Sequence, residues 1–390
     1  MTVLNQYMFP ISVILALACS DKLLTPVTVE PRPVSTDPDT ASLPTDTGVS
    51  TDSDTDTFEY AEEAVTGHVG FAAYTDGGMF PLTGGDGGDT IEVATVAELQ
   101  TAIDGKDDNT PRMIIVSGAL RADEDEEVVD RIELDGKRDL HIVGKDENAS
   151  LQGAGINIKN ESTNIIIQNL TIHNVPGDSN DCIAINNSHN IWIDHCSLYN
   201  DIDKPDDYDS LLDITHGSDY ITVSWNDFHD CGKGLIVGHA DDNAEEDAGT
   251  FHVTYHHNKF SNIGPGQLSI RFGKAHVFNN QFTHQDGNDI TALSSRMNAC
   301  VRAEFNRFDL GSNNTPINTR ESGTDSDEIG FIEDIRNEFN TPPVPVSITD
   351  TCELKVPDEL PYEYLHTINR TSKLGDILRE IGPKPTPVQP

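Results

Sequence analysis

The chain has 390 residues, and its 66 Asp and Glu against 25 Lys and Arg give a formal net charge of −41 at pH 7. Nucleic-acid binding needs a field of the opposite sign, so this charge argues against a nucleic-acid partner. A charge of this size more often keeps a protein soluble than it indicates which ligand the protein binds. An anionic ligand would therefore have to be held by local cations or by a bound metal.

The N-terminus is typical of an export signal. A short apolar run begins at Pro10 and leads into ALAC, which ends at Cys19 and resembles the lipidation motif of bacterial lipoproteins. A signal peptide normally has Lys or Arg before its apolar run, and this sequence has neither there. We expect residues 1–19 to be a signal peptide and the protein to be secreted or extracytoplasmic. A lipid on Cys19 would hold it at a bacterial outer membrane; ordinary cleavage nearby is the alternative.

Residues 20–59 are rich in Thr, Ser, Asp and Pro and hold few apolar side chains. Such a segment cannot bury enough apolar surface to repay its ordering, which predicts a disordered linker. We expect the folded domain to span residues 60–390. No segment after the export signal has the roughly 18 unbroken apolar residues that a membrane helix needs.

The folded domain begins with Gly-rich turns, followed by a strand at 90–93 and a helix. Thr95 is the expected N-cap of this helix, and Glu98 three residues later completes a capping box. Further segments with strand-like alternation follow at 113–120, 140–144, 156–160 and 165–172.

Five eight-residue segments then repeat one pattern, starting at Ile191, Ile221, Val253, Ala275 and Val301. Their starts are 30, 32, 22 and 26 residues apart, and the sixth position of the last four is Asn226, Asn258, Asn280 and Asn306. A strand pattern that repeats at this spacing predicts a solenoid, because one rung buries its inward face only when neighbours stack on it. The fold class is therefore all-β, a parallel β-helix. We interpret the Asn residues as a side-chain ladder at a bend.

After Phe308 the pattern thins, and the chain ends near a helix-like segment at 372–382. Short helices near the two ends of the solenoid would cap its exposed strand edges. Besides Cys19 there are five cysteines, an odd number; Cys300 with Cys352 is the preferred disulfide, although spacing alone cannot assign a pair. No Cys/His cluster has zinc-site spacing.

Several long motifs carry a family resemblance. The segments GFAAYTDGG, VATVAELQTAI, NASLQGAGINIK, IWIDHCSL, SLLDITHGSDYITVSWNDFHDCGKGLIVGH, VTYHHNKF and IRFGKAHVFNNQF occur in order. From about Val69 onward the chain resembles the pectate lyases of polysaccharide lyase family one. The resemblance implies a right-handed parallel β-helix that binds Ca²⁺ and cleaves polygalacturonate (pectate) by β-elimination to 4,5-unsaturated products. We expect a monomer acting on this substrate or a related polyuronate.

Elimination removes a proton next to the substrate carboxylate, so positive charge must neutralise that carboxylate and stabilise the transition state. Asp181, Asp209 and Asp213 match the calcium ligands of the family, and adjacent coils could bring them to one face. Oxygen-only ligands with open positions suit calcium. A further acidic ligand of some members is Ser179 here. Without the resemblance, acidic residues in such an acidic chain would be taken as solvated surface groups.

Lys233 and Arg271 match the substrate-contacting cations of the family, and we expect them to be the catalytic residues. The planar fork of Arg271 could hold a uronate carboxylate through two bonds. The arginine that acts as base in the family lies five residues before this position, where the present chain has Gly266. Lys233 could replace that base, or another cation, Arg296 or Arg302, could reach in. The alternative is a non-catalytic or weakly active polyuronate-binding protein.

Two other readings are weaker. His256, His257 and the Asp194-His195 pair invite a hydrolytic triad, but no Gly-x-Ser-x-Gly elbow accompanies them, so we interpret them as structural. A polygalacturonase that hydrolyses with two carboxylates would not need Lys233 and Arg271.

Overall fold

The computed structural model describes residues 60–123, 131–177, 181–284, 289–319, 328–340 and 360–387. The chain divides into two units, Met1–Asp56 and Thr57–Pro390. All described residues belong to the second unit. The predicted signal peptide and linker, as well as Ser179 and Cys352, lie outside the described residues.

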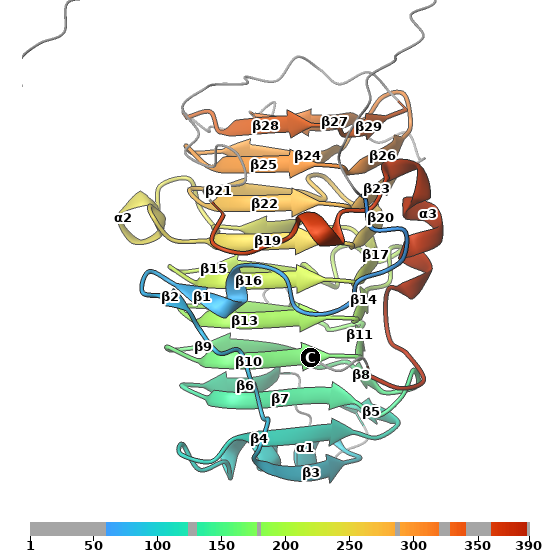
Figure 1. Ribbon diagram of the computed structural model, residues 1–390. Helices are drawn as coiled ribbons and strands as arrows, with labels where there is room; N and C mark the ends of the chain where they lie inside the picture. The colour runs from blue at the N-terminus through green and yellow to red at the C-terminus, as the bar shows by residue number, and fades with distance from the viewer. Residues whose placement is uncertain are drawn as a thin grey trace, which may run out of the picture. The chain divides into compact units, whose positions relative to one another are not determined.

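Three parallel sheets form the second unit, and Figure 1 shows their strands stacked coil upon coil. Sheet 1 contains, in spatial order, β3 (Asp89–Val93), β4 (Arg112–Val116), β7 (Arg138–Gly144), β10 (Thr163–Gln168), β13 (His189–Asp194), β16 (Asp219–Ser224), β19 (His252–His256), β22 (Lys274–Phe278), β25 (Cys300–Glu304) and β28 (Phe331–Ile335). Sheet 2 contains β5 (Ala119–Arg121), β8 (Ser150–Gln152), β11 (Thr171–His173), β14 (Ser197–Tyr199), β17 (Asp227–Cys231), β20 (Lys259–Ile263), β23 (Gln281–His284), β26 (Arg307–Leu310) and β29 (Glu338–Phe339).

Sheet 3 contains β6 (Arg131–Asp135), β9 (Gly155–Lys159), β12 (Ile183–Asn186), β15 (Leu212–Thr215), β18 (Leu235–Val237), β21 (Leu268–Arg271), β24 (Thr291–Arg296) and β27 (Thr315–Asn318). In the central coils each strand pairs in parallel with the strand of the same sheet one coil earlier and one coil later. The predicted parallel β-helix is confirmed.

The eight-residue repeats are not single strands. Each divides into a strand of sheet 1, a sharp bend and a strand of sheet 2, and the bend residue has a positive φ of 48° to 57° at His195, Trp225, His257, Asn279 and Phe305. Such a conformation costs a non-glycine residue roughly 1–2 kcal/mol. Hydrogen bonds made directly after each bend offset this cost.

Those hydrogen bonds form the predicted asparagine ladder. The Nδ2 of Asn226 donates to the Oδ1 of Asn258 at 3.0 Å, and the same bond links Asn258 to Asn280 and Asn280 to Asn306. A fifth member that we did not predict, Asn337, accepts from Asn306 at 2.9 Å. Each Oδ1 also accepts the backbone N–H of the Asn one coil earlier, so the buried bend loses no donor.

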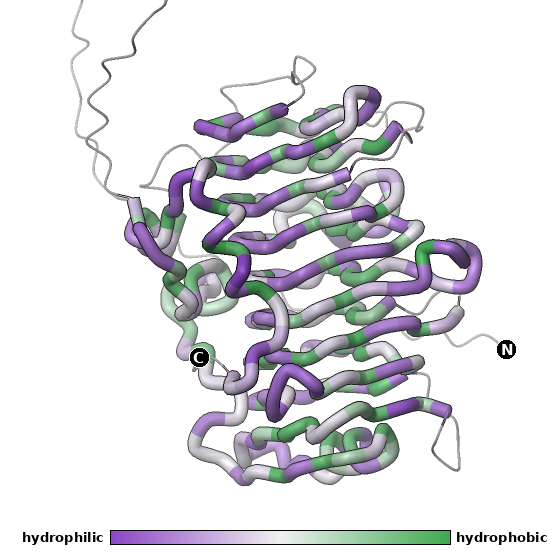
Figure 2. Tube along the Cα trace, turned by 90° about the vertical axis from the view of Figure 1, so that its right-hand side faces the viewer, coloured by the Kyte–Doolittle hydropathy of each residue, from purple (hydrophilic) through white to green (hydrophobic). Residues whose placement is uncertain are grey.

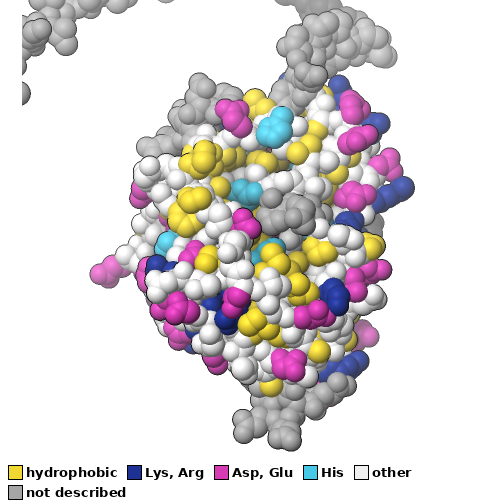
Figure 3. Space-filling view, turned by 60° about the horizontal axis from the view of Figure 1, so that its bottom comes forward, with side chains coloured by type: hydrophobic (Ala, Val, Ile, Leu, Met, Phe, Trp, Pro, Cys, Tyr) yellow, Lys and Arg dark blue, Asp and Glu magenta, His cyan; other side chains and the backbone are white. Residues whose placement is uncertain are grey.

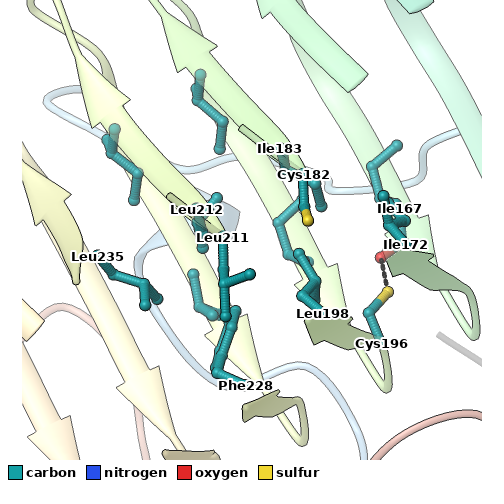
Figure 4. Close-up of a cluster of buried hydrophobic side chains, with 14 of the residues drawn as sticks. Ile167, Ile172, Cys182, Ile183, Cys196, Leu198, Leu211, Leu212, Phe228 and Leu235 are labelled. Carbon is teal, nitrogen blue, oxygen red and sulfur yellow. Dashed lines mark hydrogen bonds between the residues drawn. The ribbon is translucent and has the colours of Figure 1, made fainter. Parts of the chain in front are cut away.

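The core lies between the three sheets and consists of side chains that point inward from each strand. Figure 4 shows Ile183, Leu212 and Leu235 from sheet 3 together with Leu198 and Phe228 from sheet 2, and all five are fully buried. One aromatic column runs through five coils at ring-centroid distances of 4.6 to 5.2 Å, made by Phe228, Phe260, Phe282, Phe308 and Phe339. Along the tube in Figure 2, hydrophobic and hydrophilic positions alternate, as inward and outward positions of a strand should.

An N-terminal segment, residues 60–84, crosses the outer face of sheet 1 (Figure 1). It contains η1 (Phe71–Ala73) and an antiparallel hairpin of β1 (Tyr74–Thr75) and β2 (Gly78–Met79). The Thr254 and Thr222 hydroxyls accept the backbone N–H groups of Phe71 and Ala72 at 3.1 and 3.0 Å. Apolar clusters fill the space beneath it, so this segment covers the middle of sheet 1.

The helices are short. In α1 (Val96–Asp104) the Thr95 hydroxyl accepts the Glu98 N–H at 3.1 Å, which confirms the N-cap, while the Glu98 carboxylate accepts from Ala94 rather than from Thr95. Val96, Leu99 and Ile103 are fully buried, so α1 packs on the first coils as predicted.

The C-terminal segment is placed differently from the prediction. It contains η2 (Leu365–Thr367), η3 (Thr371–Lys373), α3 (Leu374–Ile377) and η4 (Leu378–Glu380) and runs along the side of the stack in Figure 1. Its backbone bonds to Asn279, then to Trp225, then to Asn169, each at the bend after sheet 1 and each in an earlier coil. The segment therefore runs back along the bends instead of capping the last coil, because polar groups and a buried Leu374 tie it there.

Cys300 is disulfide-bonded, whereas Cys182, Cys196 and Cys231 are free and buried. The predicted partner, Cys352, lies outside the described residues. Within the described ranges, the helices are all too short and too polar to cross a bilayer.

Charged side chains of both signs lie next to each other on the surface. On the face drawn in Figure 3, acidic side chains (magenta) lie around the rim and several have Lys or Arg (dark blue) beside them. Arg112 pairs with Asp89 and Lys145 with Glu92, each at 2.6 Å. Exposed pairs of this kind contribute roughly 0–1 kcal/mol each, so they limit repulsion more than they hold the fold.

Candidate functional site

The register of sheet 3 gathers the predicted site residues. Ile183, Leu212, Leu235 and Leu268 are Cα partners on four successive coils. Two residues before them lie Asp181, Ser210, Lys233 and Gly266, in that order. Asp209 precedes Ser210, and Asp213 follows Leu212 on β15. The predicted calcium ligands, Lys233 and the position of the missing base therefore share the entry edge of sheet 3.

The three aspartates interact electrostatically. Burial raises the pKa of Asp181, and the carboxylates of Asp213 and Asp209 raise it further. Burial is also the main cause of the raised pKa of Asp213, with Asp209 adding to it. Protein donors reach each of them: Ser210 N–H donates to Asp181 at 3.1 Å, Ile236 N–H to Asp213 at 3.4 Å and Lys233 Nζ to Asp209 at 3.0 Å. Carboxylates that resist ionisation together are stabilised by a cation between them.

The donor chemistry fits calcium, but the protein does not form a closed cage. Carboxylate oxygens are the ligands that calcium prefers. However, within the part of the chain that the structure describes, no three or more His, Cys, Asp or Glu side chains are grouped closely enough to hold a metal by themselves. Asp181, Asp209 and Asp213 would therefore hold the ion together with oxygens from water or substrate.

Lys233 is the more exposed of the two predicted catalytic cations. Its side chain is 45% exposed, and its Nζ lies 3.0 Å from the Oδ1 of Asp209. This ion pair holds the ammonium group at the entry edge of sheet 3, where it could bind a uronate carboxylate.

Arg271 ends β21 on the same sheet, five positions after Gly266 at the entry edge. Its Nε lies 2.6 Å from the Oδ1 of Asp241, and its Nη1 donates to the Gly238 carbonyl at 2.6 Å. Arg296, its register partner on β24, reaches the same Asp241 oxygen at 2.8 Å. Sequence reasoning missed Asp241, since it is one of several acidic residues in the loop after β18 and no local pattern distinguishes it.

Gly266 has a φ of +72°, in the left-handed region. A Cβ built there would have only ordinary contact, 3.8 Å from Ser269, so backbone conformation rather than space disfavours a side chain. Its carbonyl oxygen would be 1.7 Å from a Cβ on Gly234, so the two turns pack backbone to backbone. The glycine therefore fits the left-handed conformation of this turn.

The structure separates the remaining candidates. Arg302 lies on β25 of sheet 1, 3.0 Å from Glu304, so the suggestion that it reaches the site is wrong. His256 and His257 also belong to sheet 1 and its bend, are fully buried and contact each other at 2.9 Å. Asp194 and His195 form an equally buried pair at 2.6 Å. These groups are structural, as the sequence predicted, because burial keeps solvent and substrate away.

A polar chain on the outer face of sheet 3 was also missed. Asn157 donates to Glu133 at 2.9 Å, Asn186 to Asn157 at 2.9 Å, and Thr215 to Asn186 at 2.6 Å. Lys159 pairs with Glu133 at 2.8 Å. The polar surface around the aspartates thus continues over the earlier coils.

Comparisons with known proteins identify the family. The sequence profile described as pectate lyase matches residues 53–364. Probable pectate lyase B of Aspergillus terreus is 36% identical over 305 residues, which cover 77% of this chain and 86% of that protein. A pectate trisaccharide-lyase of Bacillus licheniformis is 38% identical over 62% of this chain and 67% of its own.

Solved structures give the same result. The crystal structure of a pectate lyase from a Bacillus species in complex with trigalacturonate superposes with a TM-score of 0.67 at 30% identity and covers 82% of this chain and 99% of that one. A Bacillus subtilis pectate lyase variant, at 20% identity and a TM-score of 0.65, supports the fold alone. The profile, these relatives and the shared β-helix together show that this chain belongs to the pectate lyase family of polysaccharide lyases.

Proposed function

We propose that the protein is a calcium-dependent pectate lyase that cleaves polygalacturonate by β-elimination to 4,5-unsaturated products. The observation that carries the proposal is the gathering of Asp181, Asp209, Asp213, Lys233 and Arg271 on one face of sheet 3. Relatives that are pectate lyases by name support the substrate class.

The side chains have distinct tasks in this proposal. Lys233 and Arg271 bind uronate carboxylates, and the aspartate trio holds the calcium ion. When bound, calcium supplies positive charge that neutralises a substrate carboxylate and so acidifies the neighbouring C–H. Removing the C5 proton then expels the oxygen at C4, and fixed cations stabilise the charge that develops.

The residue that takes the C5 proton is the open part of the mechanism. Gly266 cannot accept a proton, and Lys233 is ion-paired with Asp209 at 3.0 Å. Lys233 lies at the register position of Gly266 one coil earlier, so it remains our candidate base. The alternative, a protein that binds polyuronate without cutting it, is not favoured by relatives that are enzymes.

Absorbance of the unsaturated product tests the proposal directly. The purified protein should generate the ultraviolet band of the 4,5-unsaturated uronate from polygalacturonate with calcium, and a chelator should abolish the signal. If the protein binds oligogalacturonate but releases no unsaturated product when calcium is present, the non-catalytic alternative would be favoured.

The metal site has its own prediction. Asp209→Asn with Asp213→Asn should weaken calcium binding at least about tenfold by calorimetry, because two of three anionic ligands are lost. Thermal unfolding without calcium should not move to a lower temperature, since the core does not depend on these side chains and the substitutions remove mutually repelling carboxylates. Unchanged calcium affinity in the double variant would remove the proposed site.

We also propose that residues 1–19 direct export and that Cys19 carries a lipid. Residues 20–59 would then be a linker to a monomeric folded domain. Mass spectrometry of membrane-extracted protein would show the added lipid on an N-terminal Cys19, and sedimentation would report the oligomeric state. A water-soluble product cleaved elsewhere would exclude the anchor.

A further inference from the structure

Two arginines on adjacent coils converge on one acidic residue. Arg271 and Arg296 are Cα partners at the ends of β21 and β24. Asp241 lies in the loop after β18 (Leu235–Val237), one coil before Arg271. Its Oδ1 lies 2.6 Å from the Nε of Arg271 and 2.8 Å from the Nη2 of Arg296.

This arrangement is costly without Asp241. The side chains of Arg271 and Arg296 are only 11% and 4% exposed, whereas that of Asp241 is 26% exposed. Like charges directly opposite each other on paired strands repel. Removing one partner from buried ion pairs leaves uncompensated charge. Asp241 therefore compensates charge on two guanidinium groups at one edge of sheet 3.

A second feature fixes the direction of Arg271. Its Nη1 donates to the Gly238 carbonyl, and Gly238 has a φ of +81°. A Cβ on Gly238 would lie 3.0 Å from the Cβ of Arg271, so the absence of a side chain there makes room for the arginine. Asp241 and Gly238 thus hold two different nitrogens of one planar group, which leaves a single orientation.

Two guanidinium groups at one edge suit an anionic substrate. Arg271 and Arg296 hold them there in a protein whose formal net charge is −41. Fixed cations bind a carboxylate more tightly than mobile ones, because less side-chain freedom is lost on binding.

We propose that Asp241 is a positioning residue that joins Arg271 and Arg296 into one rigid unit for binding a uronate carboxylate. The inference rests on the proposed polyuronate substrate. It extends the site by two residues, Asp241 and Arg296, beyond the predicted Arg271.

Replacement of Asp241 should change the KM for polygalacturonate in opposite directions for two possible roles of this residue. If Asp241 positions the arginines, Asp241→Ala should raise the KM for polygalacturonate at least about tenfold, with a smaller change in kcat. Asp241→Asn, which keeps an acceptor oxygen, should recover part of the loss. If Asp241 instead competes with substrate for Arg271, both substitutions should lower KM, which would overturn the proposal.

Asp242→Ala is the matched control, since it removes the same charge from the neighbouring, exposed position. It should leave KM within about twofold. A merely structural role of Asp241 would lower the melting temperature and the active fraction, and hence kcat, without raising KM.

A double-mutant cycle identifies the residue through which Asp241 acts. In an Arg271→Lys background, Asp241→Ala should add little to the rise in KM, because the group that it orients is already altered. Fully additive effects would overturn the proposal. Calorimetric affinity for oligogalacturonate, measured on the same variants, separates the two questions: absence of product from the native protein refutes the lyase, while unchanged affinity of Asp241→Ala refutes the positioning role.

Discussion

Gly266 and Lys233 occupy the same register position on adjacent coils, two residues before Leu268 and Leu235. A side chain at 266 would therefore emerge one coil beyond Lys233 and two coils beyond Asp209. That proximity explains why an arginine could serve as a base there. It also shows what the glycine changes, since the turn around it has a φ of +72° and packs against Gly234.

Gly266→Arg should restore the missing base. A non-glycine residue at this φ costs roughly 1–2 kcal/mol, so we expect a folded but less stable protein. General-base catalysis typically contributes about 10²–10⁴-fold, so turnover at alkaline pH should rise at least about tenfold. Initial rates of product absorbance against pH would measure the gain.

Gly266→Ala is the control for this substitution, because it carries the same backbone cost without the guanidinium. Lys233→Ala should abolish the activity of the native chain. A folded Gly266→Arg protein with unchanged turnover, beside a native enzyme of ordinary lyase speed, would show that another residue is the base.

At the scale of elements, the asparagine ladder joins the coils at the bend between sheets 1 and 2. Asn258 donates through Nδ2 to the Val223 carbonyl at 2.9 Å and to Asn280 at 3.0 Å. Its Oδ1 accepts both the backbone N–H and the Nδ2 of Asn226 at 3.0 Å. One amide therefore satisfies buried groups on both sides of its own coil.

Asn258→Ala should lower the free energy of unfolding by at least about 3 kcal/mol, because each buried group left unsatisfied costs roughly 1–3 kcal/mol. Asn337→Ala is the matched control. Asn337 ends the ladder and is only partly buried, so water can replace its bonds and the loss should be smaller. Urea denaturation measures both; equal losses would mean that the ladder does not stabilise the interior coils.

At the scale of the whole molecule, buried neutral histidines lie where the terminal segments meet sheet 1. Burial lowers the pKa of His68, His141 and His257 to about 4. His68 belongs to the N-terminal segment and reaches Thr222 at 3.2 Å, and His257 contacts Asn369 of the C-terminal segment at 2.8 Å. Charging these imidazoles would oppose the packing of both segments.

The sign follows from proton linkage. An unfolded histidine has a pKa of about 6.5, so between about pH 6.5 and 4 the unfolded chain binds more protons than the folded one. Stability is therefore fully present above pH 6.5 and falls as the pH approaches 4, by on the order of 2 kcal/mol for each histidine. The histidine contribution to the melting temperature should therefore decrease from pH 7 to 4.5.

The raised pKa values of Asp181 and Asp213 act in the opposite direction, because stability associated with them rises as the pH falls. The aspartates are the same in the native protein and in a His141→Gln variant, so their contribution cancels when the two pH curves are compared. The variant, which has no imidazole to charge, should lose less stability between pH 7 and 4.5 than the native protein does. Parallel pH curves would show that His141 does not titrate in this range.

The sequence by itself determined the fold class and the family. Period-two alternation, a spacing of 22 to 32 residues between repeats and an Asn at one place in each repeat are local features, and they report the strand, the coil and the bend. The motifs that carry Asp181, Asp209, Asp213, Lys233 and Arg271 were equally readable, since each lies next to a strand whose register could be counted.

Only the tertiary structure decided which groups face one another across coils. Asp241 meets Arg271 and Arg296 from a third coil, and Arg302 lies on sheet 1 instead of sheet 3, although nothing near either residue in the sequence distinguishes them. The C-terminal segment follows the bends because its partners, Asn279, Trp225 and Asn169, are brought into line only by the stacking of the coils. Local sequence patterns indicate local conformation. These contacts depend instead on how far the chain rises over all the intervening coils and on the register in which those coils stack.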